Sequence, residues 1–203
     1  RQEFGLDQTR YFLMREVPFG NDGDFSRRAM IHRMNGDLAN DLGNLSQRVL
    51  SMIFKNCGGV MPALPETPAA EDRALLDSAD TMLAWVRGHM ESQSFHEALR
   101  CIWDVVSDAN KYVDATAPWG LKKTDPERMG EVLAVLAETI RQAAILVQPV
   151  MPESASRILD QLGVATDLRG FDMLAGAGRI AAGAEIGKPE PVFPRYVVEE
   201  EEA

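Results

Sequence analysis

The chain has 203 residues, of which 45% are apolar, and this is enough material for one domain with a sizeable core. Its formal net charge is −10, which excludes a general duplex-binding protein because Lys and Arg normally supply the affinity for phosphates. No apolar run approaches the roughly 20 residues that span a bilayer, and the amino end lacks the apolar stretch of a signal peptide, so we expect neither secretion nor a membrane anchor.

The first part of the chain predicts a short helix followed by a long one. Apolar residues near helical spacing favour a helix from Asp7 to Val17, which ends before a proline. Ser26 closes a Gly/Asn/Asp loop and is a good N-cap for the next helix. That helix should run from Arg27 to Phe54, because apolar residues recur in it at steps of three and four. Gly36 and Gly43 predict a kink in it, or a close approach by another backbone.

The rest of the chain predicts further helices and then a different kind of segment. Residues 58–70 combine two glycines with three prolines and predict a loop. Helical patterns then cover four segments with short links, residues 71–91, 94–116, 126–148 and 152–162. We therefore expect an all-α fold, an antiparallel helical bundle. From Gly163 the helical period is lost, and we expect this short non-helical tail to form a strand or hairpin that packs on another part.

The sequence offers no catalytic or metal centre. It contains no Walker or dinucleotide-type glycine loop, no HExxH motif and no serine in a GxSxG context. His89 and His96 could share a region, but a metal site needs further ligands, so surface or capping roles are favoured. Carboxylates repeated along residues 97–108 are best explained as a solvated acidic face. Cys57 and Cys101 form no CxxC pair, so we expect no disulfide framework or zinc site, and a cytoplasmic location.

The negative charge is unevenly distributed along the chain. Four acidic charges lie in the run from Glu199 to Glu202, which is best explained as a solvated tail, and without them the net charge is −6. Residues 26–60 carry five basic and two acidic side chains, a local charge of +3. A local reader of exposed bases is compatible with this distribution.

One candidate binding feature is a row of polar side chains on the long helix. Asn40, Asn44 and Arg48 follow one another at i, i+4 and i+8, which places them on one helix face. An Asn offers both a carbonyl and an amide, and an Arg offers five donors in a fixed fork, so this row could read the edge of a base. Spacing alone favours the simpler alternative, a plain solvent-facing surface.

A second candidate feature is a tryptophan at a helix junction. Pro118 breaks the preceding helix and places Trp119 at the start of a new segment, followed by Lys122 and Lys123. An unstacked base can lie on an indole face, with a gain of roughly 1–3 kcal/mol. The alternative is that Trp119 plugs the core at the end of the bundle, and the residues alone favour it because large aromatic side chains are usually well buried.

Five segments carry a family resemblance that covers almost the whole chain. They are GLDQTRYFLMREVPFGNDGDFS (5–26), MNGDLANDLGNLSQRVLSMI (34–53), NKYVDATAPW (110–119), LVQPVMPESASRIL (146–159) and PEPVFPRY (189–196). In this order they resemble bacterial-type methionyl-tRNA synthetases downstream of the KMSKS loop. The DLANDLGNL and REVPFGNDGDFS blocks are the most specific, whereas YxxxxxPW also occurs in related class I synthetases.

The resemblance implies a bundle of the class I aminoacyl-tRNA synthetase anticodon-binding type, which binds the CAU anticodon of tRNA(Met). By motif match, the residues that read the anticodon are Asn44, Arg48 and Trp119. The indole would stack on the first anticodon base, a cytosine, while the Asn and the Arg satisfy its polar edge. Pro118 and Tyr112 would set the position of the tryptophan.

The resemblance also implies three parts of the chain and a larger protein. We expect a stem-contact segment over residues 1–25, the anticodon-binding bundle over 26–162, and a tail over 163–203 that packs back towards a catalytic domain. The HIGH-like and KMSKS signatures are absent from this sequence, so ATP and methionine would bind upstream of Arg1. We expect no cofactor in this chain, a tRNA(Met) anticodon loop and the catalytic domain as its partners, and a monomer.

Alternative functions stay open. A helical protein-interaction bundle is favoured by the negative charge, and in it Trp119 is buried structure and a change at Arg48 has no effect on RNA binding. The anticodon domain of a cysteinyl, isoleucyl, valyl or leucyl enzyme shares the helical architecture. An enzyme with its own site is the weakest alternative.

Overall fold

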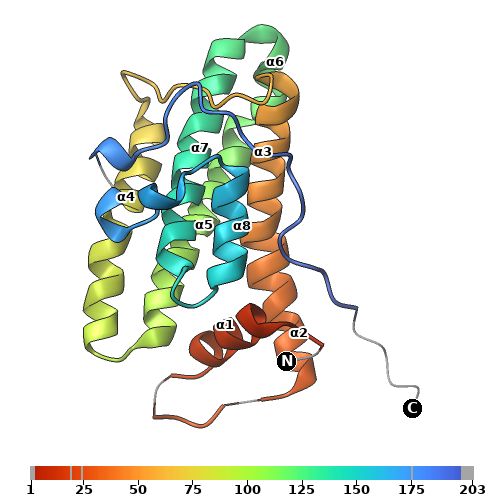
Figure 1. Ribbon diagram of the computed structural model, residues 1–203, viewed down its shortest axis with the longest axis vertical. Helices are drawn as coiled ribbons and strands as arrows, with labels where there is room; N and C mark the ends of the chain where they lie inside the picture. Colours follow the sequence, from red (N-terminus) through yellow and green to blue (C-terminus); the bar gives the residue numbers. More distant parts are fainter. Residues whose placement is uncertain (1–2, 19, 24, 175, 198–203) are drawn as a thin grey trace.

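The computed structural model describes residues 3–18, 20–23, 25–174 and 176–197, and Figure 1 shows a bundle of roughly parallel and antiparallel helices. Its helices are α1 (Leu6–Glu16), α2 (Arg27–Arg33), η1 (Met34–Gly43), α3 (Asn44–Asn56), α4 (Ala70–Glu91), α5 (Phe95–Thr116), α6 (Pro118–Thr124), α7 (Pro126–Val147) and α8 (Pro152–Gln161). Helix α1 lies at one end of the bundle and α6 at the other. The predicted all-α bundle is confirmed, and the bounds of the predicted helices agree within about two residues, whereas α6 was not predicted as a helix.

The long helix runs through α2, η1 and α3 without a break, as predicted, but its middle is a π-helix. Ser26 caps its start, since its Oγ accepts from the amide of Ala29 at 3.1 Å. At Gly43 the predicted close approach comes from the same helix and from a side chain rather than from another backbone, and at Gly36 no neighbouring atom is close. A Cβ at Gly43 would lie 2.7 Å from the carbonyl oxygen of Leu38, five residues back, and 3.2 Å from the ring of Phe193 in the tail. The missing side chain therefore admits both the wide helical turn and the tail.

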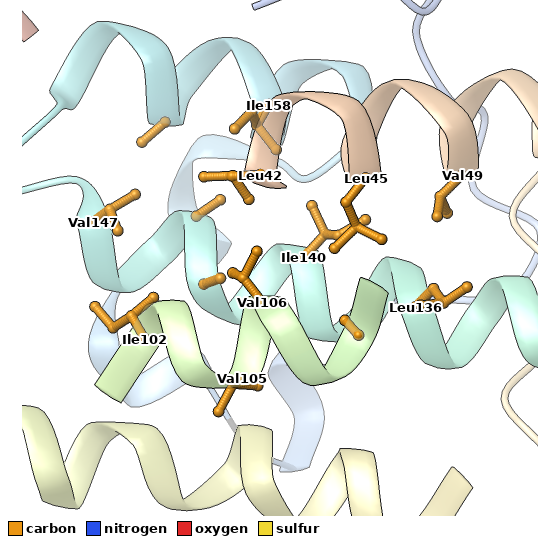
Figure 2. Close-up of a cluster of buried hydrophobic side chains, with 14 of the residues drawn as sticks. Leu42, Leu45, Val49, Ile102, Val105, Val106, Leu136, Ile140, Val147 and Ile158 are labelled. Carbon is orange, nitrogen blue, oxygen red and sulfur yellow. The ribbon is translucent and has the colours of Figure 1, made fainter. Parts of the chain in front are cut away.

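Helix α7 is the centre of the core. Every residue from Val132 to Val147 is buried, and a helix that is apolar on nearly all sides is expected in such a position. Figure 2 shows side chains of α3, α5, α7 and α8 meeting around it, among them Leu45, Val106 and Ile140. No helix within the described ranges is both long and apolar enough to cross a membrane.

A buried ion pair joins α7 to the C-terminal tail. The Arg141 guanidinium, completely buried, donates to both carboxylate oxygens of Glu138 at 2.9 and 2.7 Å. Its remaining donors reach the carbonyl oxygens of Met173 and Leu174 at 2.9 and 3.0 Å. The amide of Ile180 in turn donates to Glu138 at 2.9 Å. Both charges are thus saturated, partly by backbone groups of the tail.

The predicted strand or hairpin in the tail is wrong for the described residues. They form three 3-10 turns, η2 (Thr166–Leu168), η3 (Phe171–Met173) and η4 (Gly176–Gly178), and one isolated bridge between Val60 and Glu185. The physical reason is that side chains of the bundle satisfy much of the tail backbone, so no neighbouring strand is needed. Beyond Glu185 the tail follows α8 and the long helix, where Asn35 exchanges two hydrogen bonds with the backbone of Tyr196.

The saturated ion pair predicts a large effect of removing one partner. Arg141→Met would leave the Glu138 carboxylate buried without a cation, and we expect it to lower the free energy of unfolding by about 3–5 kcal/mol. Urea titration monitored by circular dichroism measures this loss. A double variant, Glu138→Leu with Arg141→Met, should recover most of it because no buried charge remains. A free energy of unfolding of Arg141→Met within about 1 kcal/mol of the wild-type value would contradict a stabilising role of this ion pair.

Candidate nucleic-acid interface

Trp119 lies on the surface at the α6 end of the bundle. Helix α5 ends at Thr116, and Ala117 turns the chain with a left-handed backbone, φ 43° and ψ 57°. Pro118 then starts α6 with a buried ring, while the side chain of Trp119 is 53% exposed. The alternative in which Trp119 plugs the core is therefore wrong. The buried proline instead anchors a turn that presents the indole to solvent.

Arg48 faces the indole from α3. The centre of its guanidinium lies 5.5 Å from the centroid of the Trp119 ring, within the range of a cation–π contact. The Arg48 Nη2 donates to Asp114 Oδ1 at 2.8 Å, and the side chain of Asp114 is itself mostly exposed. The structure therefore brings together two residues that are 71 positions apart in the sequence. An aromatic face and a held guanidinium beside it are an arrangement that suits a planar, polar ligand.

The two asparagines of the predicted row lie in different surroundings. Asn44 is the first residue of α3 and is exposed, one turn before Arg48, so its amide is free to bind a ligand beside the guanidinium. Asn40 lies in the π-helix, and its Oδ1 accepts from the guanidinium of Arg195 in the tail. Its exposed side chain is thus tied to the C-terminal segment rather than directed towards Trp119.

Tyr112 is buried and belongs to a polar cluster with Asp72 and Arg128, called the Asp72 cluster below. The carboxylate of Asp72, fully shielded from solvent, accepts from Tyr112 Oη at 2.6 Å. It also accepts from Nη1 and Nη2 of Arg128, both at 2.6 Å, and from the amide of Ala69 at 3.2 Å. This is a bidentate pair with further donors, the strongest geometry for a carboxylate.

The cluster shifts the acidity of its members in opposite directions. Burial alone would raise the pKa of Asp72, but the hydrogen bonds from Arg128 and Tyr112 outweigh it, so the pKa lies below its usual value. Burial, together with the hydrogen bond to Asp72, raises the pKa of Tyr112. The hydrogen bond to Asp72 raises the pKa of Arg128. At neutral pH the cluster is therefore an ionised pair with a neutral phenol.

Exposed lysines lie at the same end of the bundle as Trp119. Lys122 and Lys123 are exposed on α6, and Lys55 is exposed near the end of α3, which lies at the same end of the bundle (Figure 1). Asp114 is the acidic residue that contacts Arg48 there. Asp125 and Glu127, which directly follow α6, are exposed as well, so the lysines at this end are accompanied by carboxylates.

The histidines and carboxylates noted in the sequence form no comparable site. His89 lies near the end of α4 and His96 near the start of α5, where its Nε2 is 3.2 Å from a carboxylate oxygen of Glu97. Within the part of the chain that the structure describes, no group of three or more His, Cys, Asp and Glu side chains is placed to hold a metal ion.

Sequence reasoning missed three residues of this region. Asp114 lies five positions before Trp119, within the segment NKYVDATAPW, but nothing in its spacing indicates that it contacts Arg48. Asp72 and Arg128 are ordinary charged residues in the first turns of two predicted helices. Their meeting depends on how α4, α5 and α7 pack, which no local pattern shows.

Comparison with known proteins gives consistent matches over the chain. Residues 62–203 match the family model described as the anticodon binding domain of methionyl tRNA ligase, and residues 1–50 match that of class I tRNA synthetases (M). The chain is 52% identical over 202 residues to a methionine–tRNA ligase of Brucella suis, covering 99% of this chain and 39% of the relative. It is 50% identical over 199 residues to that of Mycobacterium leprae, covering 96% and 36%.

A solved structure shows the same fold. The apo form of Mycobacterium tuberculosis methionyl-tRNA synthetase matches with a TM-score of 0.92 and 48% identity, over 98% of this chain and 40% of that one. A structure of the same enzyme bound by methionyl-adenylate matches with a TM-score of 0.91. This chain therefore spans about two fifths of the length of these relatives.

The lowered pKa of Asp72 predicts how stability depends on pH. At pH 7 we expect Asp72→Asn to lower the free energy of unfolding by about 1.5–3 kcal/mol, the range for hydrogen bonds to charged groups. Because the folded pKa lies below the unfolded value of about 3.9, this contribution is complete above pH 4 and is lost as the pH falls further. Denaturant titrations of both proteins between pH 7 and pH 3 measure the gap. A gap that stays constant down to pH 3 would show that the charge of Asp72 does not stabilise the fold.

Proposed function

Because this chain belongs to the methionyl-tRNA synthetase family, we propose that its helical bundle reads the CAU anticodon of tRNA(Met). The whole protein would ligate methionine to that tRNA with ATP, through the aminoacyl-adenylate with which a relative has been crystallised. Catalysis, ATP and methionine would belong to parts outside this chain. We further propose that the protein is a cytoplasmic monomer and that residues 1–25, 26–162 and 163–203 act as stem-contact segment, reading bundle and tail.

The exposed Trp119 under the Arg48 guanidinium is the observation that carries the proposal. A tryptophan side chain that is 53% exposed, on a turn fixed by a buried proline, is a ready surface for an unstacked base. Single-stranded loops are read in this manner, by aromatic stacking combined with hydrogen bonds to the edges of splayed bases. The first anticodon base is the one that we place on the indole.

Arg48 and Asn44 supply the hydrogen bonds for the edge of that base. A cytosine has acceptor atoms next to an exocyclic amine, so it needs both donors and an acceptor from the protein. Arg48 has donors beyond the one used by Asp114, and the Asn44 side chain offers an amide and a carbonyl. A uracil presents the reverse pattern at two of these positions, which would leave polar groups unpaired. The lysines on α6 and Lys55 would contact phosphates without reading sequence.

Binding to an anticodon stem-loop tests this function directly. We expect Trp119→Ala to weaken binding of a CAU stem-loop at low salt by roughly 5- to 150-fold, because about 1–3 kcal/mol of stacking is lost. Trp85→Ala is the matched control, since Trp85 is 47% exposed on α4 and lies away from α6. Fluorescence anisotropy of a labelled stem-loop measures both. Equal losses in the two variants would contradict a stacking role for Trp119.

Arg48→Lys tests the reading of the base edge. The lysine keeps the positive charge but lacks the planar fork, so affinity for phosphates is retained while the preference for CAU over a loop with a changed first base falls about tenfold or more. The ratio of the two dissociation constants is the measurement. A protein-interaction bundle would instead show no preference in the wild type and no effect of this change.

A further inference from the structure

Helix α6, which carries Trp119, is too short to hold its own position. It has seven residues, and isolated helices below about 12–15 residues are marginal in water. The turn before it contains Ala117 with φ 43°, a backbone conformation that a residue with a side chain adopts only when its surroundings impose it. The placement of the indole must therefore come from the helices on either side, α5 and α7.

Both neighbouring helices are bound to the same carboxylate. Tyr112, in the last turns of α5, donates to one oxygen of Asp72, and Arg128, in the first turn of α7, donates to both. Tyr112 lies six residues before the start of α6, and Arg128 four residues after its end. Asp72 thus fixes the distance between the end of α5 and the start of α7, the two helix ends that flank α6.

The Asp72 cluster is built as a rigid unit. The carboxylate is fully shielded from solvent and accepts four hydrogen bonds, three of them at 2.6 Å. Its partners come from α5 and α7 and from Ala69, just before α4, so it joins three segments at one point. A shift of α5 against α7 would break at least one of these bonds and leave a buried charge underpaired, which is strongly disfavoured.

We propose that Asp72 and Arg128 are positioning residues for anticodon reading, because they fix the end of α5 and the start of α7 and thereby hold Trp119 beneath Arg48. This inference rests on the proposed function for its RNA readout. Its structural content, the placement of Trp119, is independent of any ligand. In this proposal neither side chain contacts the base itself.

Fluorine NMR of fluorotryptophan-labelled protein tests the placement without RNA. The chain has three tryptophans, and Trp85 and Trp103 lie on α4 and α5 as internal references. In Asp72→Asn we expect the Trp119 resonance to shift or broaden while the other two stay in place. Glu138→Gln is the matched control, because it also changes a buried carboxylate to an amide in an ion pair, ten residues further along α7 than Arg128. We expect it to leave Trp119 unchanged.

Stem-loop binding then tests the consequence for reading. We expect Asp72→Asn to reduce the preference for CAU over a changed first base about tenfold, within the range that loss of base stacking covers. Glu138→Gln should keep the wild-type ratio although it too destabilises the fold. In a Trp119→Ala background, Asp72→Asn should have no further effect on the ratio, because the two changes remove the same contribution.

The possible results separate the two proposals. A wild type without a CAU preference would overturn the proposed function, while the NMR comparison would still decide the placement of Trp119. A CAU preference in the wild type with an unmoved Trp119 resonance in Asp72→Asn would overturn the positioning role. The positioning role would also be overturned if the Trp119 resonance moves in Asp72→Asn while the ratio of the two dissociation constants stays at the wild-type value.

Discussion

The complete burial of α7 from Val132 to Val147 is the constraint on which the rest of the structure depends. A helical stretch without a solvent-facing side has to be covered in every direction, so α3, α4, α5, α8 and the tail are all arranged around it. Apolar cover alone is not sufficient, because Glu138, Arg141 and Gln142 lie in its buried stretch. Their hydrogen-bonding groups need partners, and the tail backbone supplies several of them.

The same helix links the core to the exposed interface. Its middle is fixed by packing and by the ion pair of Glu138 with Arg141, and its first turn carries Arg128, which binds Asp72. The position of α6 therefore depends on the position of α7, whose middle is buried in the core. Trp119 lies on a short, exposed helix, but the Asp72 carboxylate that joins the neighbouring helices is shielded from water.

Features of the fold that depend on local interactions could be predicted from the sequence, and features that depend on long-range packing could not. Apolar periodicity and punctuation by Pro and Ser are local, and they predicted the helices and the Ser26 cap. The glycines indicated an irregularity near residues 36–43, but neither its form as a π-helix nor the packing of Phe193 at Gly43, from 150 positions away, could be predicted from them. Such long-range packing has no local pattern, and neither has the fold of the tail.

The candidate site shows the same division. Composition and spacing drew attention to Trp119 and Arg48 for separate reasons, and the family resemblance joined them. The contact between them is a result of how α3 and α6 meet at the end of the bundle. The residues alone favoured a buried Trp119, because large aromatic side chains are usually buried. That general tendency does not include the effect of the buried Pro118, which fixes a turn that exposes the indole. The roles of Asp114 and of the Asp72 cluster could not be predicted from the sequence, since ordinary surface carboxylates occur in the same sequence patterns.

The net charge of −10 limits how such a domain can bind RNA. Phosphate neutralisation requires clustered cations, and the exposed lysines at the α6 end lie among carboxylates such as Asp125 and Glu127. In the proposed function the affinity would then come mainly from stacking and from hydrogen bonds that depend on geometry, and both are lost when the indole or the guanidinium is displaced. An acidic reader of a single loop therefore needs a rigid support more than a basic one does. A carboxylate buried between three helical segments, with every oxygen saturated by fixed donors, is a support of this kind. In a longer protein, contacts elsewhere on the same tRNA would raise the effective concentration of the loop, so this domain could contribute selectivity without binding tightly by itself.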